Sequence, residues 1–362
     1  MLAIRSGHFT ALFLYDVAQA IELRTIAGLI QAAVPSRLPP RPITPAYVRY
    51  QEAPLAVDAE AVGLGRIDGC QVRFKVFDYG VISVALTRPL PASWPDLVRQ
   101  GLDWHESAGL AGEAEGLCRQ LITRIQPAVV GLREDFVAED YLVFSITALD
   151  DHVSSEDLLR AHGHDIAELL RGEREPLSRD ERDEVLRHRL SYLESDLVIP
   201  TWNAAFVYDD EKGAQAVLEL LEFANSQLLE FRYYDGLLDR ELARIYAQLQ
   251  APGWFSSWSR RYTRAARAVH TLFIDVNELT DRTENALKIA GDVYAARVLA
   301  LASTRLGLDY WKASVREKLK TVDDIYRFAV ERTGMVRGEF LELVIVLILL
   351  LELVLFFMGL ME

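Results

Sequence analysis

The sequence predicts an α+β protein with a ferredoxin-like βαββαβ head, a long antiparallel α-helical hairpin or stalk, and a single C-terminal transmembrane helix. Three observations support this fold class. Gln71–Phe77 alternates polar and apolar residues with period two among other short apolar runs of the first 150 residues, proline is absent after Pro252, and 17 of the 20 residues from Leu341 to Leu360 are large and apolar. Such alternation is typical of half-buried strands, a proline-free stretch permits long helices, and about 20 apolar residues span a bilayer.

The head is predicted over residues 1–150. Its order of elements is βαββαβ, the arrangement of a ferredoxin-like sandwich, and Asp78–Gly80 supplies the turn between the second and third strands. The expected strands are His8–Tyr15, Gln71–Phe77, Val81–Leu86 and Tyr141–Ile146, and the expected helices are Ala18–Val34 and Pro91–Ile125.

Residues 151–210 are expected to form an α/β connecting segment packed on the head. One helix is predicted to begin around Ser155, and another begins after Ser178, where Glu181 three residues later completes a capping-box pattern. Two short apolar runs on either side of Pro200 predict strands.

The helical stalk is predicted over residues 211–333. Apolar residues recur four and three residues apart from Val217 to Leu249, which is the pattern of a coiled-coil heptad. A second such pattern runs from Val269 to Val293, and a third helix from Asp309 to about Arg332. Asp235 is the polar member of the first pattern. We expect it to fix the register of the stalk rather than to act in catalysis, because a polar core residue often sets register.

Residues 334–362 are predicted to form the C-terminal transmembrane anchor. Glu352 lies near the middle of the apolar run, where a charge costs about 2.5–3.5 kcal/mol on insertion scales. It is expected to contact a neighbouring transmembrane helix, and the alternative is a tolerated neutral carboxylic acid. Arginines precede the run and no basic residue follows it, so the positive-inside rule places the body in the cytoplasm.

An aromatic and arginine-rich segment interrupts the acidic balance at the predicted tip of the hairpin. Rings and guanidinium groups suit the headgroup region of a bilayer, which favours a membrane-interface foot. A solvated tip with inward-packed aromatic rings and a site for RNA are the alternatives. The residues of the predicted foot are Trp254, Phe255, Trp258, Arg260, Arg261, Arg264 and Arg267.

The composition excludes some functions and leaves no catalytic motif. The formal net charge of −14 argues against broad binding to nucleic acid. The two cysteines have no metal-binding spacing, and His162 and His164 point apart on a helix. The glycines around Gly65 precede a strand, whereas a dinucleotide-binding loop follows one. We therefore predict no catalytic, cofactor-binding or metal-binding residue and no cofactor.

Several local motifs together resemble the Required for Meiotic Nuclear Division 1 family. The resemblance runs through Tyr79-Gly80, Ser191-Tyr192, Asp196-Leu197, Trp202–Ala205, Asn285–Asp292, Trp311, Arg337–Glu342 and Glu352. It implies a membrane-anchored protein without enzymatic chemistry. With no transit peptide evident, it implies a bacterial inner-membrane protein, the alternative being the mitochondrial inner membrane.

Together these observations favour a non-enzymatic, tail-anchored scaffold that self-associates. Its expected partners are membrane lipid, further copies of itself, and another membrane or cytoplasmic protein. Two alternatives stay open. The first is a small-molecule sensor or enzyme with a pocket in the α+β head, and the second is a multimeric transport or channel-like assembly that uses Glu352.

Overall fold

The computed structural model describes residues 3–30, 33–35, 53–65, 67, 69–106, 108–250, 274, 276, 293–325, 327, 345 and 346. The chain divides into two compact units. Unit 1 comprises Met1–Tyr233 and Leu279–Lys312, and unit 2 comprises Tyr234–Glu278 and Ala313–Glu362.

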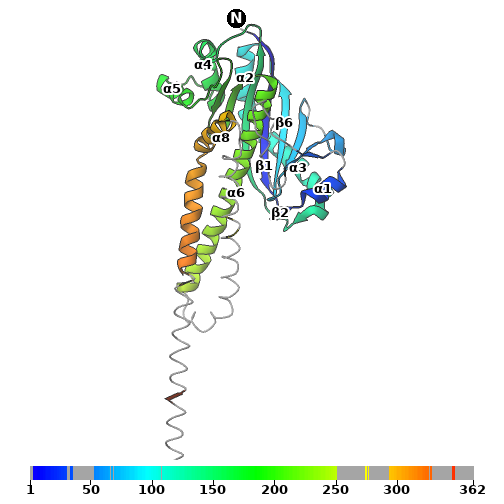
Figure 1. The fold of residues 1–362 in the computed structure, drawn as a ribbon, viewed down its shortest axis with the longest axis vertical. Coiled ribbons are helices and arrows are strands. Elements are labelled where there is room, and N and C mark those ends of the chain that lie inside the picture. Colours follow the sequence, from blue (N-terminus) through cyan, green and yellow to red (C-terminus); the bar gives the residue numbers. More distant parts are fainter. Residues whose placement is uncertain are drawn as a thin grey trace, which may run out of the picture. The chain divides into compact units, whose positions relative to one another are not determined.

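Unit 1 is built on a mixed eight-stranded sheet (Figure 1) with the strand order β3-β4-β5-β6-β1-β8-β10-β9. All neighbouring strands are antiparallel except β8 and β10, which are parallel. A separate two-stranded sheet pairs β2 with β7. The strands are β1 (Ile4–Asp16), β2 (Ala20–Ile21), β3 (Val34–Pro35), β4 (Leu55–Asp58), β5 (Gln71–Val76), β6 (Val81–Pro89), β7 (Val129–Val130), β8 (Val137–Leu149), β9 (Leu197–Pro200) and β10 (Ala204–Tyr208).

The protein is thus α+β, but the predicted four-stranded ferredoxin-like head is wrong in extent. The four strands from its βαββαβ pattern lie at the centre of the sheet in the order β5-β6-β1-β8. Strands β4 and β3 continue the sheet on one side and β10 and β9 on the other. The physical reason is that the edge of β8 offers free backbone donors and acceptors, with which β10 pairs, and β9 then pairs with β10. The sequence had assigned both strands to a separate connecting segment.

The two faces of the central strands differ in chemistry. Side chains alternate between the faces along a strand, so that β1 directs Phe9, Ala11 and Phe13 to one face and His8, Thr10 and Leu12 to the other. We call the first the apolar face. Its side chains are buried and belong to one hydrophobic core with Phe74, Val84, Phe144 and Ile146.

Helices cover the apolar face. They are α2 (Trp94–His105), α3 (Ala108–Ile125) and α4 (Ser155–Arg171), with the short α5 (Arg179–Arg187) packed on α4. The ring of Trp104 meets that of Phe9 edge to face, and the Tyr15 hydroxyl donates to the carbonyl of Ala111 on α3 at 3.1 Å. Burial of such large side chains stabilises the fold by about 1.5–3 kcal/mol each.

We call the opposite side of the same strands the polar face, and the long helix α6 (Glu211–Gln250) covers it. Figure 1 shows the beginning of α6 lying across β1. The Tyr79 hydroxyl hydrogen-bonds Ser226 at 2.6 Å, and Arg232 pairs with Glu139 on β8. Polar contacts, rather than apolar packing alone, thus attach α6 to the sheet.

Local signals place several element boundaries. Glu181 N–H donates to the Ser178 hydroxyl at 3.2 Å, which confirms the predicted cap of α5. The cap of α4 is Ser154, one residue before the predicted Ser155, and it accepts from Asp157 N–H at 3.1 Å. A serine cap contributes about 1 kcal/mol.

The expected helix over Ala18–Val34 is shorter than predicted. The chain instead forms β2 and then the seven-residue α1 (Leu23–Leu29). Unit 1 is completed by α8 (Val293–Arg305) and by the helical residues up to 312.

In unit 2, residues 234–250 of α6 lie against the helical residues 313–325. Lys318 Nζ contacts Asp235 Oδ1 at 2.8 Å and Asp239 Oδ1 at 2.7 Å, and Ser314 donates to Asp235 Oδ1 at 2.7 Å. These contacts pair two helical segments that the sequence assigned to the stalk.

The predicted single C-terminal transmembrane helix is not supported. A span requires about 20 consecutive, predominantly apolar residues. Within the part of the chain that the structure describes, no helix is both long enough and apolar enough to cross a bilayer. The membrane and tail-anchor predictions are therefore corrected. Of residues 341–360, only Ile345 and Val346 belong to the described part.

Candidate functional site

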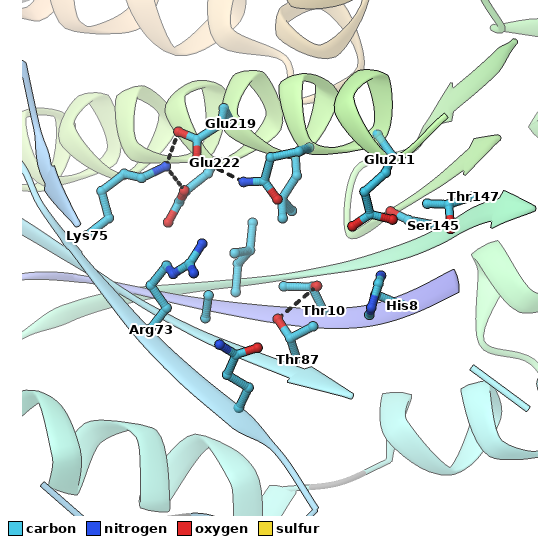
Figure 2. Close-up of a pocket in the computed structure, with 16 residues that line it drawn as sticks. His8, Thr10, Arg73, Lys75, Thr87, Ser145, Thr147, Glu211, Glu219 and Glu222 are labelled. Carbon is cyan, nitrogen blue, oxygen red and sulfur yellow. Dashed lines mark hydrogen bonds and ion pairs between the residues drawn. The ribbon is translucent and has the colours of Figure 1, made fainter. Parts of the chain in front are cut away.

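A cavity of about 220 Å³ lies in unit 1 between the polar face of the sheet and the first three turns of α6. Figure 2 shows the lining residues that come from the sheet and those that come from the helix. The floor comes from β1, β5, β6 and β8, and the roof from α6. The lining residues are His8, Thr10, Leu12, Gln71, Arg73, Lys75, Ala85, Thr87, Ser145, Thr147, Glu211, Ala214, Gln215, Leu218, Glu219 and Glu222.

The side-chain repeat of the strands and that of the helix bring these residues together. In the strand register Gln71 lies opposite Thr87, Thr87 opposite Thr10, and His8 opposite Ser145. Directly opposed residues share a face, so one surface of the sheet carries a continuous polar set. On α6 the polar lining residues are spaced four, four and three apart from Glu211 to Glu222, which places them on one side of the helix.

A buried ionic cluster lies at one end of the cavity. Lys75 is only 4% exposed, and its ammonium group contacts the carboxylates of both Glu219 and Glu222. Gln215 also donates to Glu219, at 3.1 Å. We call Lys75, Glu219 and Glu222 the Lys75 cluster.

The Lys75 cluster keeps its lysine protonated. Burial alone would lower the pKa of Lys75, but the carboxylates of Glu222 and Glu219 outweigh burial and raise that pKa above its usual value. A nucleophilic lysine needs a lowered pKa. The arrangement therefore favours a structural and electrostatic role for Lys75 over covalent catalysis.

Two groups of opposite charge face the cavity with unused hydrogen-bonding capacity. Arg73 donates through Nε to Asp58 Oδ1 at 2.9 Å, and its two terminal nitrogens have no partner among the described residues. Glu211, in the first turn of α6, likewise has no ionic or hydrogen-bond partner in the described part of the chain. In Figure 2 both side chains point into the space between helix and sheet.

Between these charges the floor is lined by hydroxyl groups. Thr10 and Thr87 hydrogen-bond one another at 3.1 Å, and Thr147 donates to Ser6 at 3.0 Å. Ser145 is 7% exposed, yet its hydroxyl has no partner among the described residues. The Ser145 hydroxyl borders the cavity and is not among the fully shielded side-chain atoms, so it is open to water or to a bound molecule.

The lining chemistry limits what the cavity binds. The described lining includes no Phe, Tyr or Trp, whose rings commonly stack on flat bases. Within the described residues, no group of three or more His, Cys, Asp or Glu side chains is placed to hold a metal ion. The volume lies below the range of about 300–1,000 Å³ for drug-sized ligands. These features suit a small, polar, non-aromatic molecule.

A second buried ion pair lies on the same polar face, at the end of β1. Asp16 is fully buried and accepts from Arg133 Nε at 2.8 Å, and the Arg133 guanidinium lies 3.6 Å from the ring centre of Tyr233. Burial raises the pKa of Asp16 to about 6, and Arg133 opposes that rise. Asp16 does not line the cavity.

The residues singled out by the sequence lie away from this cavity or outside the described residues. Asp235 lies in unit 2, bonded to Ser314 and Lys318, and its role in register stays a prediction. Glu352 lies outside the described residues, as do Trp254, Phe255, Trp258, Arg260, Arg261, Arg264 and Arg267 of the predicted foot. The expected self-association and protein partners also stay predictions.

Sequence reasoning missed the cavity although one signal was present. The strand Gln71–Val76 alternates polar and apolar residues, which predicted only a half-buried strand. A lysine on such a strand, and acidic residues on a helix far along the chain, usually face solvent. Only the packing of α6 on β5 turns Lys75, Glu219 and Glu222 inward.

Comparison with known proteins identifies one family. The family described as "Uncharacterized protein MJ0711, N-terminal domain" matches residues 6–215, which run from β1 into the first turns of α6. Uncharacterized protein MJ0711 of Methanocaldococcus jannaschii is 23% identical over 221 residues, which cover 61% of this chain and 66% of that protein. The match thus spans slightly less than two thirds of the relative. No solved structure matches this chain.

The suspected membership of the Required for Meiotic Nuclear Division 1 family is therefore wrong. The motifs behind it include ordinary turn chemistry. Gly80 has a φ of +95° in the turn between β5 and β6, and a Cβ there would lie 2.0 Å from the carbonyl oxygen of Ala18. Asp196 accepts from the backbone N–H groups of Tyr192 and Leu193 at 2.6 and 2.9 Å. Such turns recur in unrelated folds.

Proposed function

We propose that this chain, which belongs to the family of the N-terminal domain of uncharacterized protein MJ0711, is a binding protein for a small polar molecule. The ligand occupies the cavity between the polar face of the sheet and α6. This function corresponds to the alternative of a pocket in the α+β head. The scaffold function expected from the sequence stays a prediction.

The observation that carries the proposal is the buried ionic cluster beside unpaired polar groups. Taking two or more charges out of water costs several kcal/mol for each ion, and a hydrophobic replacement is often neutral or stabilising. Lys75 and Glu222 are nevertheless buried at the edge of a cavity whose other polar groups, Ser145 and Glu211 among them, have no partner in the described residues. Binding of a ligand to these groups would account for buried charges that stability alone does not require.

The test is ligand-dependent stabilisation of the full chain. Its melting temperature is measured with millimolar amino acids, polyols, sugars, small carboxylates and polyamines. A ligand that binds only the folded state stabilises it by about 2.7 kcal/mol at 100 times its dissociation constant. At least one class is expected to raise the melting temperature.

A matched pair of variants ties the stabilisation to the cavity. Ala85→Leu places a larger side chain on the floor and is expected to abolish the shift. Ala148→Leu makes the same change at a half-buried position of β8 outside the lining and is expected to leave it intact. A shift that survives in Ala85→Leu, or the absence of any shift across the five classes, contradicts the proposed function.

A further inference from the structure

We propose that the ligand of this cavity is a linear zwitterion, a molecule with a carboxylate at one end and an ammonium group at the other. Arg73 binds the carboxylate and Glu211 binds the ammonium group. This inference rests on the proposed function and names its ligand class. An amino acid whose two charged groups are several bonds apart has the required chemistry.

The Arg73 end is equipped to receive a carboxylate. Asp58 accepts a hydrogen bond from Nε of the guanidinium group at 2.9 Å, and both side chains of this pair are about half exposed. The terminal nitrogens point toward α6 in Figure 2. These nitrogens form a planar pair of donors that matches the two oxygens of a carboxylate.

The Glu211 end is equipped to receive a cation. Its carboxylate has no ionic or hydrogen-bond partner in the described part of the chain. Figure 2 places it beside Ser145 and Thr147, with His8 across the floor. Ser145 is only 7% exposed and lines the cavity. Its hydroxyl has no hydrogen-bond partner among the described residues. Its hydroxyl oxygen is available to accept from an ammonium group already attracted by Glu211.

The other charges of the cavity already compensate one another. Lys75 contacts both Glu219 and Glu222, and Gln215 donates to Glu219. Arg73 and Glu211 are thus the charged groups with capacity for a ligand, and the Thr10 and Thr87 hydroxyls line the stretch between them. Arg73 and Glu211 are also exposed to water, so a ligand of one sign would bind one end and leave the other hydrated, whereas a zwitterion binds both.

The strand register shows that the two ends of the cavity are far apart. Arg73 pairs across to Ala85 and then to Leu12, whereas Ser145 pairs with His8. Leu12 and His8 are four residues apart on β1, which is roughly 13 Å along the strand at about 3.3 Å per residue. Strands β6 and β1 also lie between β5 and β8, which adds roughly 14 Å across the sheet at about 4.8 Å per strand. A ligand that reaches both ends is therefore longer than an α-amino acid such as alanine.

The experiment is isothermal titration calorimetry of the full chain with three probes of similar chain length. The probes are 6-aminohexanoate, hexanoate and hexylamine, and myo-inositol and sorbitol are titrated as uncharged polar probes. We expect 6-aminohexanoate to bind at least tenfold more tightly than either single-charge probe. In a series from 3-aminopropanoate to 8-aminooctanoate, affinity is expected to depend on chain length and to be weakest for 3-aminopropanoate, which cannot reach both ends.

Two variants test which residue binds which end. Arg73→Gln is expected to lower the affinity for 6-aminohexanoate at least tenfold and to leave the affinity for hexylamine unchanged. Glu211→Gln is expected to lower the affinity for 6-aminohexanoate by the same factor and to leave the affinity for hexanoate unchanged. Arg5→Gln and Glu156→Gln are the controls. Arg5 is a β1 arginine paired with Asp150, and Glu156 lies in the first turn of α4. Neither lines the cavity, so both are expected to bind like the wild type.

The outcomes separate this inference from the function on which it rests. If the polyols bind and both variants retain that binding, the zwitterion is overturned and the polar-ligand function stands. If hexanoate or hexylamine binds as tightly as 6-aminohexanoate, the two-ended recognition is overturned. If none of the charged probes binds at millimolar concentration while another class raises the melting temperature, the ligand class is wrong. If nothing binds, both proposals fail.

Discussion

The apolar and polar faces of the central sheet are built from the same strands but serve different ends. On β8, Phe144 is fully buried in the core beneath α2 and α4, while its neighbour Ser145 lines the cavity beneath α6. On β5, Phe74 and Lys75 divide in the same way. Both faces are covered by helices, yet one is close-packed and the other leaves room for a ligand.

This difference shows that burial alone does not define a core. Lys75 is 4% exposed and Ser145 is 7% exposed, values similar to those of core residues, but their neighbours are charges and hydroxyls. Apolar packing gains stability from nearly every contact, whereas a polar face gains only where each group finds a partner. Under the proposed function, a ligand supplies partners to the polar groups that line the cavity.

The largest expected effect tests the close-packed side of the comparison. Phe144→Ala removes a fully buried ring and is expected to lower the free energy of unfolding by about 3–5 kcal/mol, because the transfer and cavity costs add. Ser145→Ala, the adjacent change on the polar face, is expected to alter it by less than about 1 kcal/mol. Urea titration of both variants measures the contrast. Equal losses would show that the polar face is packed as tightly as the core.

The next effect tests the Lys75 cluster. Lys75→Met leaves Glu219 and Glu222 together without their cation. Breaking a buried ion pair costs about 3–5 kcal/mol, and since water reaches Glu219 from the cavity we expect about 3 kcal/mol. Adding Glu219→Gln and Glu222→Gln is expected to restore most of the loss. Chemical denaturation compares the single and triple variants, and a triple variant no more stable than Lys75→Met argues against uncompensated charge as the cause.

The smallest effect concerns Asp16 and its pH dependence. Its pKa is about 6 in the folded protein and near 3.8 when unfolded. Between these values the folded state binds the extra proton, so its contribution to stability is largest below pH 4 and is lost as the pH rises to 6. The loss is expected to be about 2 kcal/mol.

Asp16→Asn is the control, since it cannot titrate. Unfolding free energies of both proteins are measured from pH 4 to pH 7, and the difference between the two curves isolates Asp16 from other groups. The wild type is expected to lose about 2 kcal/mol more than Asp16→Asn over this range. Parallel curves would mean that Arg133 holds Asp16 ionised in the folded state.

Local patterns carried much of the secondary structure but not the sheet. Period-two alternation located β5, short apolar runs located β1, β6 and β8, and the Ser178 cap located α5. These signals depend on near neighbours in sequence. The addition of β10 beside β8 depends on residues about 60 positions apart, and an apolar run such as Ala204–Tyr208 is compatible with many partners.

The C-terminal transmembrane prediction rested on hydropathy alone. Among the described residues no helix is long and apolar enough to cross a bilayer, and of the run Leu341–Leu360 only Ile345 and Val346 belong to those residues. The resemblance to the Required for Meiotic Nuclear Division 1 family rested on short motifs, of which the Gly80 turn is a local backbone device.

The sequence by itself determined the α+β composition, the alternation of the strands and the acidic charge of the chain, because these follow from side-chain type and local period. Only the tertiary structure decided which alternating face becomes the core and which the cavity. Residues on β5 and α6 about 145 positions apart must meet before Lys75 can pair with Glu219 and Glu222. Charge pairing and burial depend on distance in space, and no local pattern in the chain encodes that distance.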